Sequence, residues 1–179
     1  MARKSFIYRC LEGIFFPATR IIHNPLIYKE NGEIIKKIHF DEPTILISNH
    51  IAHSDGTVLS YLTSPDKLHS LAAKDRFEQG GLMKWYLTQA ECIPIDRKGI
   101  STDWVHDSVK MLREQKESVA IFPEGRHGLN HEILPFHSAA TTVAVFSGAP
   151  IVILYNDGPY KLGKRCRFIV SEPFRLPAP

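Results

Sequence analysis

Three short apolar runs, each followed at once by polar residues, constrain the fold of this chain more than any other feature. They are PTILIS (43–48), SVAIF (118–122) and PIVILY (150–155). Continuous runs of this length are typical of parallel strands that are buried on both faces of a sheet. Because segments with helical periodicity lie between them, the pattern predicts an α/β fold with a mostly parallel central sheet flanked by helices.

Shorter elements complete the expected sheet. Further strands are predicted at 33–40, 68–74, 92–97 and 165–174, and helices at 56–62, 77–91, 101–116 and 138–148. Gly148 has the place of a helix C-terminal cap. Near the end of the third of these helices, the spacing of Arg113 and Glu117 predicts an ion pair on the helix surface.

Composition and charge narrow the classes of function. The chain has 179 residues, enough for one domain with a core, and its formal net charge is +3. This mild basic excess suits an anionic membrane surface or a phosphorylated substrate and does not require nucleic acid. The three cysteines form no CxxC pair, so we expect reduced thiols in a protein that faces the cytoplasm, and no zinc ribbon or redox dithiol.

Residues 1–28 are expected to form a helical element at a membrane interface, ahead of a main domain at 29–179. Its apolar residues share one side of a helix: Phe6, Ile7, Leu11, Ile14 and Phe15. An amphipathic helix packed on the domain has the same periodicity and remains the alternative. Pro17 and Pro25 are expected to break up the chain after this helix. No segment has the ~18 uninterrupted apolar residues of a spanning helix, so we expect peripheral or monotopic attachment on the cytoplasmic face.

Polar residues follow three of the predicted strands at the point where each strand ends. They are Asn49–His50, Asp96–Lys98 and Glu124–Arg126. In an open parallel sheet, ligand sites form beyond the carboxyl ends of the strands. If these strands are neighbours, the three groups meet at one edge, and the sequence predicts a site there.

The stretch NHIAHSDG (49–56) allows three interpretations. His50, His53 and Asp55 are sound metal ligands, although their spacing is not that of a helical zinc motif. Alternatively the stretch is a structural loop in which Asp55 caps the following helix. The third interpretation is a proton-transfer pair in which His50 is the base and Asp55 holds its ring. No serine or cysteine nucleophile with a recognisable elbow accompanies the pair, so the reacting hydroxyl would belong to a substrate.

Four blocks resemble, in order, those of the glycerophospholipid acyltransferases, the family of 1-acylglycerol-3-phosphate acyltransferases. They are NHIAHSD (49–55) with its His-x4-Asp spacing, CIPIDRKG (92–99), IFPEGR (121–126) and APIVILY (149–155). The resemblance implies an α/β domain with an N-terminal membrane-binding element. It implies an O-acyltransferase of phospholipid biosynthesis that uses a thioester of coenzyme A or acyl carrier protein. The expected acceptor is a lysophospholipid-type hydroxyl, above all 1-acylglycerol-3-phosphate, and no metal or redox cofactor is needed.

The same resemblance assigns roles to residues. His50 would be the general base and Asp55 its partner, while Arg97 would hold the phosphate of the acceptor. Glu124 and Gly125 would shape the acceptor site, and Arg126 would help to bind it.

The chain departs from the family pattern in the acceptor region. Arg126 follows Gly125 directly, His127 stands where the family usually has arginine, and His137 stands where lysine is common. The sequence leaves open whether Arg126 or His127 takes the place of the motif arginine. Two alternatives therefore remain: an acyltransferase for a lysolipid without phosphate, and a lipid-binding protein of the same fold without turnover.

Overall fold

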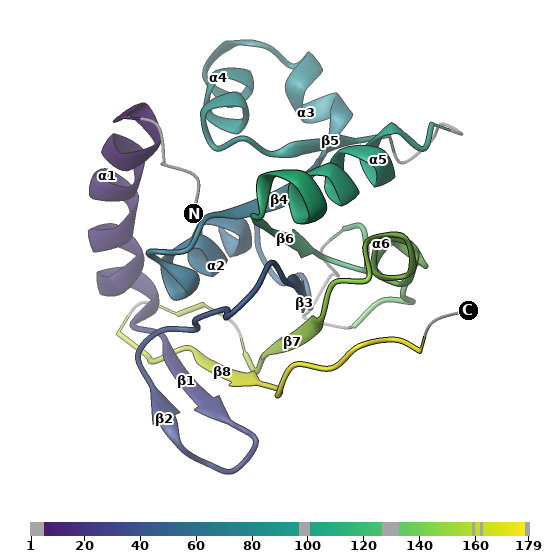
Figure 1. The fold of residues 1–179 in the computed structure, drawn as a ribbon. Coiled ribbons are helices and arrows are strands. Elements are labelled where there is room, and N and C mark those ends of the chain that lie inside the picture. The colour runs from purple at the N-terminus through teal and green to yellow at the C-terminus, as the bar shows by residue number, and fades with distance from the viewer. Residues whose placement is uncertain (1–5, 97–100, 127–132, 159, 162, 178–179) are drawn as a thin grey trace.

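The computed structural model describes residues 6–96, 101–126, 133–158, 160–161 and 163–177 (Figure 1). An eight-stranded sheet runs through the molecule in the order β2-β1-β8-β7-β3-β6-β4-β5. The strands are β1 (Leu26–Lys29), β2 (Ile34–Ile35), β3 (Ile45–Ser48), β4 (Leu68–Ala73), β5 (Ile93–Ile95), β6 (Ser118–Ile121), β7 (Ile151–Asn156) and β8 (Arg167–Val170). The helices are α1 (Phe6–His23), α2 (Asp55–Thr63), α3 (Lys74–Glu78), α4 (Gly81–Gln89), α5 (Asp103–Lys110) and α6 (Ala139–Ser147).

The centre of the sheet is parallel, as the apolar runs predicted. Strand β3 pairs in parallel with β7 on one side and β6 on the other, and β6, β4 and β5 continue the parallel order. Strand β8 is antiparallel to β7, and the short β2 is antiparallel to β1. The α/β fold class with a mostly parallel central sheet is therefore confirmed.

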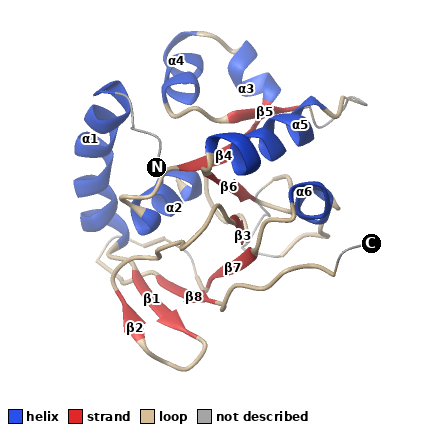
Figure 2. Ribbon diagram, viewed as in Figure 1, coloured by secondary structure: helices blue, strands red, loops and turns tan. Residues whose placement is uncertain are grey.

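Helices cover both faces of the sheet and create two cores (Figure 2). On one face, Val58, Leu59 and Leu62 of α2 pack with Leu46 of β3. On the other face, side chains of α5 and α6 pack with Ile45. Because adjacent residues of a strand point to opposite faces, Ile45 and Leu46 enter different cores. This double burial explains why the run PTILIS is continuously apolar.

The expected helix at 77–91 is in fact two helices. Helix α3 ends at Glu78 and α4 begins at Gly81, and the glycine pair between them has positive φ angles of 70° at Gly80 and 57° at Gly81. Residues with a side chain adopt this region at a cost, whereas glycine does so freely. The glycine pair therefore breaks the helical periodicity that the sequence suggested.

The predicted strand at 33–40 is also shorter than expected, because only Ile34 and Ile35 pair with β1. The residues that follow bond elsewhere. The backbone N–H of Ile38 donates to the carbonyl of Leu62, and that of Phe40 donates to the side chain of Asp66. The end of α2 and the turn after it therefore take the hydrogen bonds that a longer strand would have made.

Helix α1 runs through Pro17 to His23, so Pro17 does not end it. The helix both packs and exposes apolar surface. Its buried side includes Tyr8 and His23, whereas Ile14 and Ile21 are 67% and 73% exposed. None of the helices in the described part of the chain has the length and hydropathy that a membrane crossing requires. The expected boundary between residues 28 and 29 falls inside β1, which pairs with β8.

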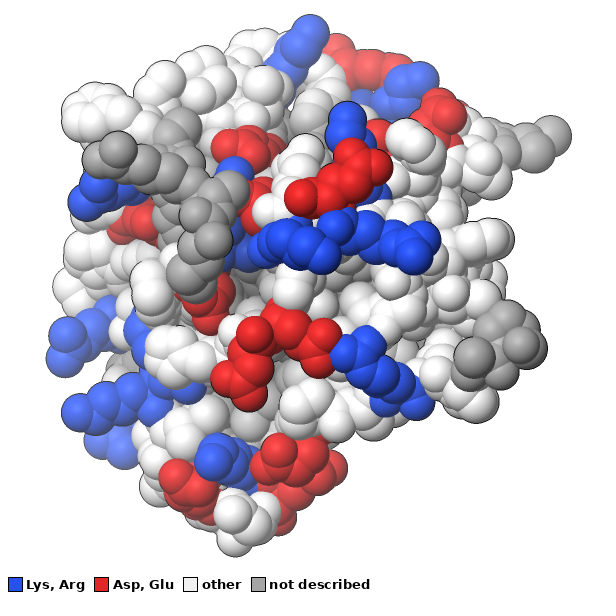
Figure 3. Space-filling model, in the orientation of Figure 1, with Lys and Arg blue, Asp and Glu red and all other residues white. Residues whose placement is uncertain are grey.

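Charged side chains of both signs lie close together on one face of the molecule. On the face shown in Figure 3, Lys and Arg side chains form a band, with Asp and Glu side chains above and below it. This arrangement agrees with the small formal net charge of +3.

Candidate active site

The site begins where β3 ends. Strand β3 stops at Ser48, Asn49 and His50 follow in the turn, and α2 begins at Asp55. His50 Nδ1 lies 2.8 Å from Asp55 Oδ2. The Asp55 side chain is 3% exposed and that of His50 is 20% exposed. The predicted pair therefore exists, with a buried carboxylate and a partly accessible imidazole.

Asp55 is fixed by several donors at once. Its Oδ2 also accepts hydrogen bonds from the backbone N–H groups of Ile51 at 2.7 Å and Ala52 at 2.9 Å. Its Oδ1 accepts one from the hydroxyl of Tyr160 at 2.6 Å. A helix cap bonds to residues that follow it, whereas these backbone donors precede Asp55. The carboxylate thus orders the turn that carries His50 instead of capping α2.

The Asp55 carboxylate also selects the tautomer of His50. A carboxylate only accepts hydrogen bonds, so Nδ1 carries the hydrogen in this pair. The second ring nitrogen, Nε2, is then the basic one in the neutral ring. This is the arrangement in which an imidazole takes a proton from a substrate and the carboxylate stabilises the resulting charge.

The block after β6 meets the block after β3, because these strands are neighbours. Glu124 Oε1 accepts a hydrogen bond from the backbone N–H of His50 at 2.7 Å, and Oε2 accepts one from Leu134 at 2.8 Å. Glu124 is buried, with 3% of its surface exposed. The ring of Phe122 stacks on that of His50 with a centroid distance of 4.4 Å and an interplanar angle of 24°. Glu124 and Phe122 therefore hold both the backbone and the ring of His50.

Gly125 occupies a position that favours glycine. Its φ angle is +67°, and a Cβ atom there would lie 3.3 Å from Cδ2 of His137. The backbone N–H of His137 donates to the carbonyl of Pro123 at 2.8 Å. Arg126, the next residue, is exposed. The loop after β6 is therefore closed against the segment around His137, and Arg126 extends from it.

Two residues of the site were missed by the sequence analysis. Asn156, at the end of β7, exchanges two hydrogen bonds with Asn49, at 2.7 and 3.0 Å, and its Nδ2 donates to the hydroxyl of Tyr160 at 3.0 Å. Asn156 follows the third apolar run, as Asn49 and His50 follow the first. The expectation that polar residues at the ends of parallel strands form a site could therefore have identified it. Tyr160 lies between β7 and β8, in a stretch without periodicity, and no sequence signal marks it.

Burial shifts the pKa values of three groups around Asp55. Burial, and next the negative charge of Asp55, raise the pKa of Tyr160 far above its usual value, so its hydroxyl stays protonated. Burial also raises the pKa of the Cys166 thiol to about 12. Burial lowers the pKa of His23, whose ring packs 4.1 Å from that of Tyr160, and the charge of Asp55 opposes this shift.

Other predicted residues lie elsewhere or outside the described residues. Arg97 and His127 belong to segments that the structure does not describe, so their predicted roles stay predictions. Asp96 follows β5, which β4 separates from β6. The groups after β3 and β6 therefore meet directly, whereas Asp96 follows a strand that lies two positions beyond β6.

Among the described residues, the side chains whose geometry could hold a metal are not those of the metal interpretation. His53 is exposed. Within the described ranges, the residues whose ligand atoms all come together are His69, Glu91 and Glu117, and these surround β4 rather than the end of β3.

The comparisons with known proteins agree with this architecture. A model of the acyltransferase family matches residues 27–155. The chain belongs to the acyltransferase family. The chain is 29% identical over 150 residues to the mouse protein named 1-acyl-sn-glycerol-3-phosphate acyltransferase alpha, and 28% identical to its human counterpart. Each alignment covers 80% of this chain, and the chain spans about half the length of these curated relatives, 51% and 52%.

A solved structure supports the fold. The crystal structure of the 1-acyl-sn-glycerophosphate acyltransferase PlsC from Thermotoga maritima superposes with a TM-score of 0.64 at 16% identity. The match covers 94% of this chain and 69% of PlsC. At this identity the likeness concerns the fold, which includes the sheet and helices that carry His50 and Asp55.

Proposed function

We propose that this acyltransferase moves a fatty acyl group from a thioester, on coenzyme A or acyl carrier protein, to the hydroxyl of a lysophospholipid-type acceptor. The preferred acceptor is 1-acylglycerol-3-phosphate, as the names of the similar mammalian proteins suggest. One observation carries the proposal: His50 Nδ1 lies 2.8 Å from the buried carboxylate of Asp55 at the carboxyl end of a central strand. The reaction would serve phospholipid biosynthesis.

The proposed step needs one base and no bound metal or redox group. The acceptor hydroxyl gives its proton to Nε2 of His50 while its oxygen attacks the thioester carbonyl carbon. The tetrahedral intermediate then expels the thiolate, which takes the proton from His50. Asp55 stabilises the imidazolium between these two events, because its carboxylate is already aligned with Nδ1. The acyl group ends as an ester and the carrier as a free thiol.

Recognition of the acceptor phosphate is assigned to the loops after β5 and β6. Arg97 and Arg126 supply the cations, and guanidinium groups suit the planar geometry of phosphate oxygens. Glu124 and Gly125 shape the loop that carries Arg126. Replacing Arg97 with alanine should raise the KM for a phosphate-bearing acceptor roughly tenfold to a hundredfold, the range of one hydrogen bond to a charged group, while the KM for the thioester stays near its original value.

Helix α1 is proposed to rest at the cytoplasmic surface of a membrane. Ile14 and Ile21 are exposed on the same side of the helix, and Arg9 and Arg20 are exposed as well. Such a helix places its apolar side among acyl chains and its cations near anionic headgroups.

Flotation with vesicles that contain anionic phospholipid tests this placement. Ile14→Glu and Ile21→Glu together should release the protein from the vesicles. Ile34→Glu is the matched control, because Ile34 on β2 is 56% exposed and lies outside α1. If the double variant floats as well as the wild type, α1 is not the membrane contact.

A panel assay tests the proposed reaction. Purified protein is given acyl-coenzyme A or acyl carrier protein thioester with lysophosphatidic acid, lysophosphatidylcholine, monoacylglycerol or glycerol 3-phosphate, and thioester consumption is followed. We expect the highest kcat/KM with lysophosphatidic acid, which is 1-acylglycerol-3-phosphate. His50→Ala should show no detectable turnover with it. Turnover with an acceptor that lacks phosphate would favour the alternative specificity. Lipid binding without turnover on any pair would favour the non-catalytic alternative.

A further inference from the structure

Tyr160 makes the shortest hydrogen bond to Asp55, and the proposed mechanism does not use this bond. Its hydroxyl donates to Asp55 Oδ1 at 2.6 Å, whereas His50 Nδ1 and two backbone N–H groups meet Oδ2. A buried carboxylate needs donors for both oxygens, because unpaired lone pairs are costly away from water. Among the described residues, Tyr160 is the hydrogen-bond donor to Oδ1.

The hydroxyl of Tyr160 has a single possible orientation. Nδ2 of Asn156 donates to its oxygen at 3.0 Å, so the phenol hydrogen points away from Asn156 and toward Asp55. Burial and the charge of Asp55 raise the pKa of Tyr160, so the hydrogen stays in place. Tyr160 is therefore a permanent donor to Asp55.

The bonds form a closed circuit around the catalytic turn. Asn49, the neighbour of His50, bonds to Asn156, which bonds to Tyr160, which bonds to Asp55, which bonds back to His50. The circuit joins the ends of β3 and β7 to the start of α2. On its outer side the ring of His23, the last residue of α1, packs 4.1 Å from the ring of Tyr160. Helix α1 thus supports the same circuit.

We propose that Tyr160 is a positioning residue that acts through Asp55, fixing the carboxylate so that it stabilises the imidazolium of His50 during transfer. The proposal rests on the proposed acyl transfer for its effect on rate, and on the geometry alone for its effect on His50. A donor held in place before the reaction costs no reorganisation when charge develops, which is how preorganised hydrogen bonds assist catalysis. Tyr160 contacts no reacting atom, so it differs in kind from His50.

The variant Tyr160→Phe tests the role with little disturbance, because the ring that packs on His23 is kept. We expect kcat to fall roughly tenfold to a hundredfold, the range of one hydrogen bond to a charged group, with little change in KM for either substrate. Tyr155→Phe is the matched control, since Tyr155 is 39% exposed on β7. It should retain wild-type kcat.

Two further readouts separate positioning from a general loss of structure. The first is a cycle with Asp55→Asn: if Tyr160 acts through Asp55, Tyr160→Phe lowers kcat little in the Asp55→Asn background. The second is the NMR signal of the hydrogen on Nδ1 of His50, which a firmly held carboxylate keeps downfield and protects from exchange with water. In Tyr160→Phe this signal should move upfield and exchange faster, because the phenol no longer fixes Asp55.

The outcomes distinguish this inference from the proposed function. An inactive wild type would refute acyl transfer, while the Nδ1 hydrogen signal of His50 would still test Tyr160. An active wild type, with Tyr160→Phe equal to it in kcat and in this signal, would overturn the positioning role and leave acyl transfer intact.

Discussion

Two hydrogen-bonded imidazole–carboxylate pairs of the molecule lie in very different surroundings. His50 Nδ1 lies 2.8 Å from Asp55, and His69 Nε2 lies 2.5 Å from Glu117. The first pair sits at the carboxyl end of β3 with the His50 side chain 20% exposed. The second lies within the sheet, where His69 on β4 has no exposed surface.

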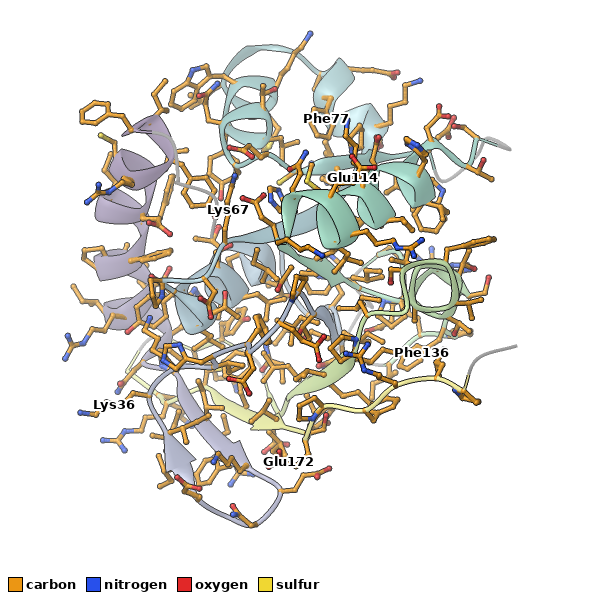
Figure 4. The ribbon with its side chains drawn as sticks, viewed as in Figure 1. Lys36, Lys67, Phe77, Glu114, Phe136 and Glu172 are labelled. Carbon is orange, nitrogen blue, oxygen red and sulfur yellow. The ribbon has the colours of Figure 1, made fainter. Side chains whose placement is uncertain are left out.

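The partners of the second pair differ from those of the first. His69 Nδ1 lies 2.9 Å from the carbonyl oxygen of Glu91, so both ring nitrogens face acceptors. Nζ of Lys67, labelled in Figure 4, lies 2.7 Å from Glu91 Oε2 and 3.3 Å from Glu117 Oε1. These four residues, which we call the Lys67 cluster, connect the segments around β4, α4 and β6. Both ring nitrogens of His69 are thus bonded inside the chain, whereas the proposed mechanism uses Nε2 of His50 as the base.

The largest expected difference between the two pairs is in turnover. His50→Ala should lower kcat by ~10²–10⁴, the usual contribution of a general base, with an unchanged circular dichroism spectrum. His69→Gln should leave kcat per folded molecule near the wild-type value, because His69 is buried among groups of the chain. Steady-state kinetics with lysophosphatidic acid measure both. Near wild-type turnover in a folded His50→Ala would contradict the assignment of the base.

The opposite order is expected for stability. Glu117→Gln removes the carboxylate that faces both Lys67 and His69, and breaking a buried ion pair in this way costs roughly 3–5 kcal/mol of unfolding free energy. Urea denaturation measures the loss.

Asp55→Asn is compared with Glu117→Gln for activity. Its kcat should fall strongly, because an amide cannot stabilise the imidazolium. At a temperature where Glu117→Gln is folded, its kcat should remain close to that of the wild type. Equal losses of kcat in the two variants would show that the pairs do not have separate roles.

The first pair was predicted from the sequence and the second was not, for a physical reason. The rule that polar residues at the ends of parallel strands form sites brought His50 and Glu124 together correctly, since β3 and β6 are neighbours. Glu117, however, was predicted on the helix surface with Arg113, and this prediction is wrong. A π-helical turn at Met111–Gln115 and the positive φ of Lys116, 58°, end the helix and redirect the chain. Glu117 is therefore buried beside Lys67.

Long-range contacts account for what the sequence could not supply. The continuous apolar runs predicted β3, β6 and β7. Burial on both faces explains the runs of β3 and β6, whereas β7 exposes Ile153 and Tyr155 on one face. No such run marks Tyr160, since its role depends on where the connection between β7 and β8 returns. The order of strands likewise decides that Asp96 is two strands away from β6. Local patterns cannot encode that order.

A smaller effect concerns the pH dependence of stability and arises at His23, near the first pair. Burial lowers the pKa of His23 below its ordinary value of 6.5, so the folded state holds fewer protons there than the unfolded state. In the pH range between the folded value and 6.5, stability therefore rises with pH and falls on acidification. His23→Phe keeps a ring against Tyr160 and removes this titration. The fall in unfolding free energy from pH 7 to pH 5 should be smaller in His23→Phe than in the wild type, and equal slopes would contradict the shift.

The smallest expected effect is that of metal ions, and it tests both pairs together. In the first pair the hydrogen bond from Nδ1 to Asp55 occupies the nitrogen and oxygen that a metal would share. In the second, His69, Glu91 and Glu117 have ligand atoms within 4.8 Å of one another, but the ammonium of Lys67 already lies against both carboxylates. Exhaustive chelation should change neither kcat nor the melting temperature, and added zinc should restore or raise neither. If chelation abolishes kcat and zinc restores it, the site at His50, His53 and Asp55 binds metal. If zinc raises the melting temperature alone, and Glu117→Gln removes that rise, the Lys67 cluster is the metal site.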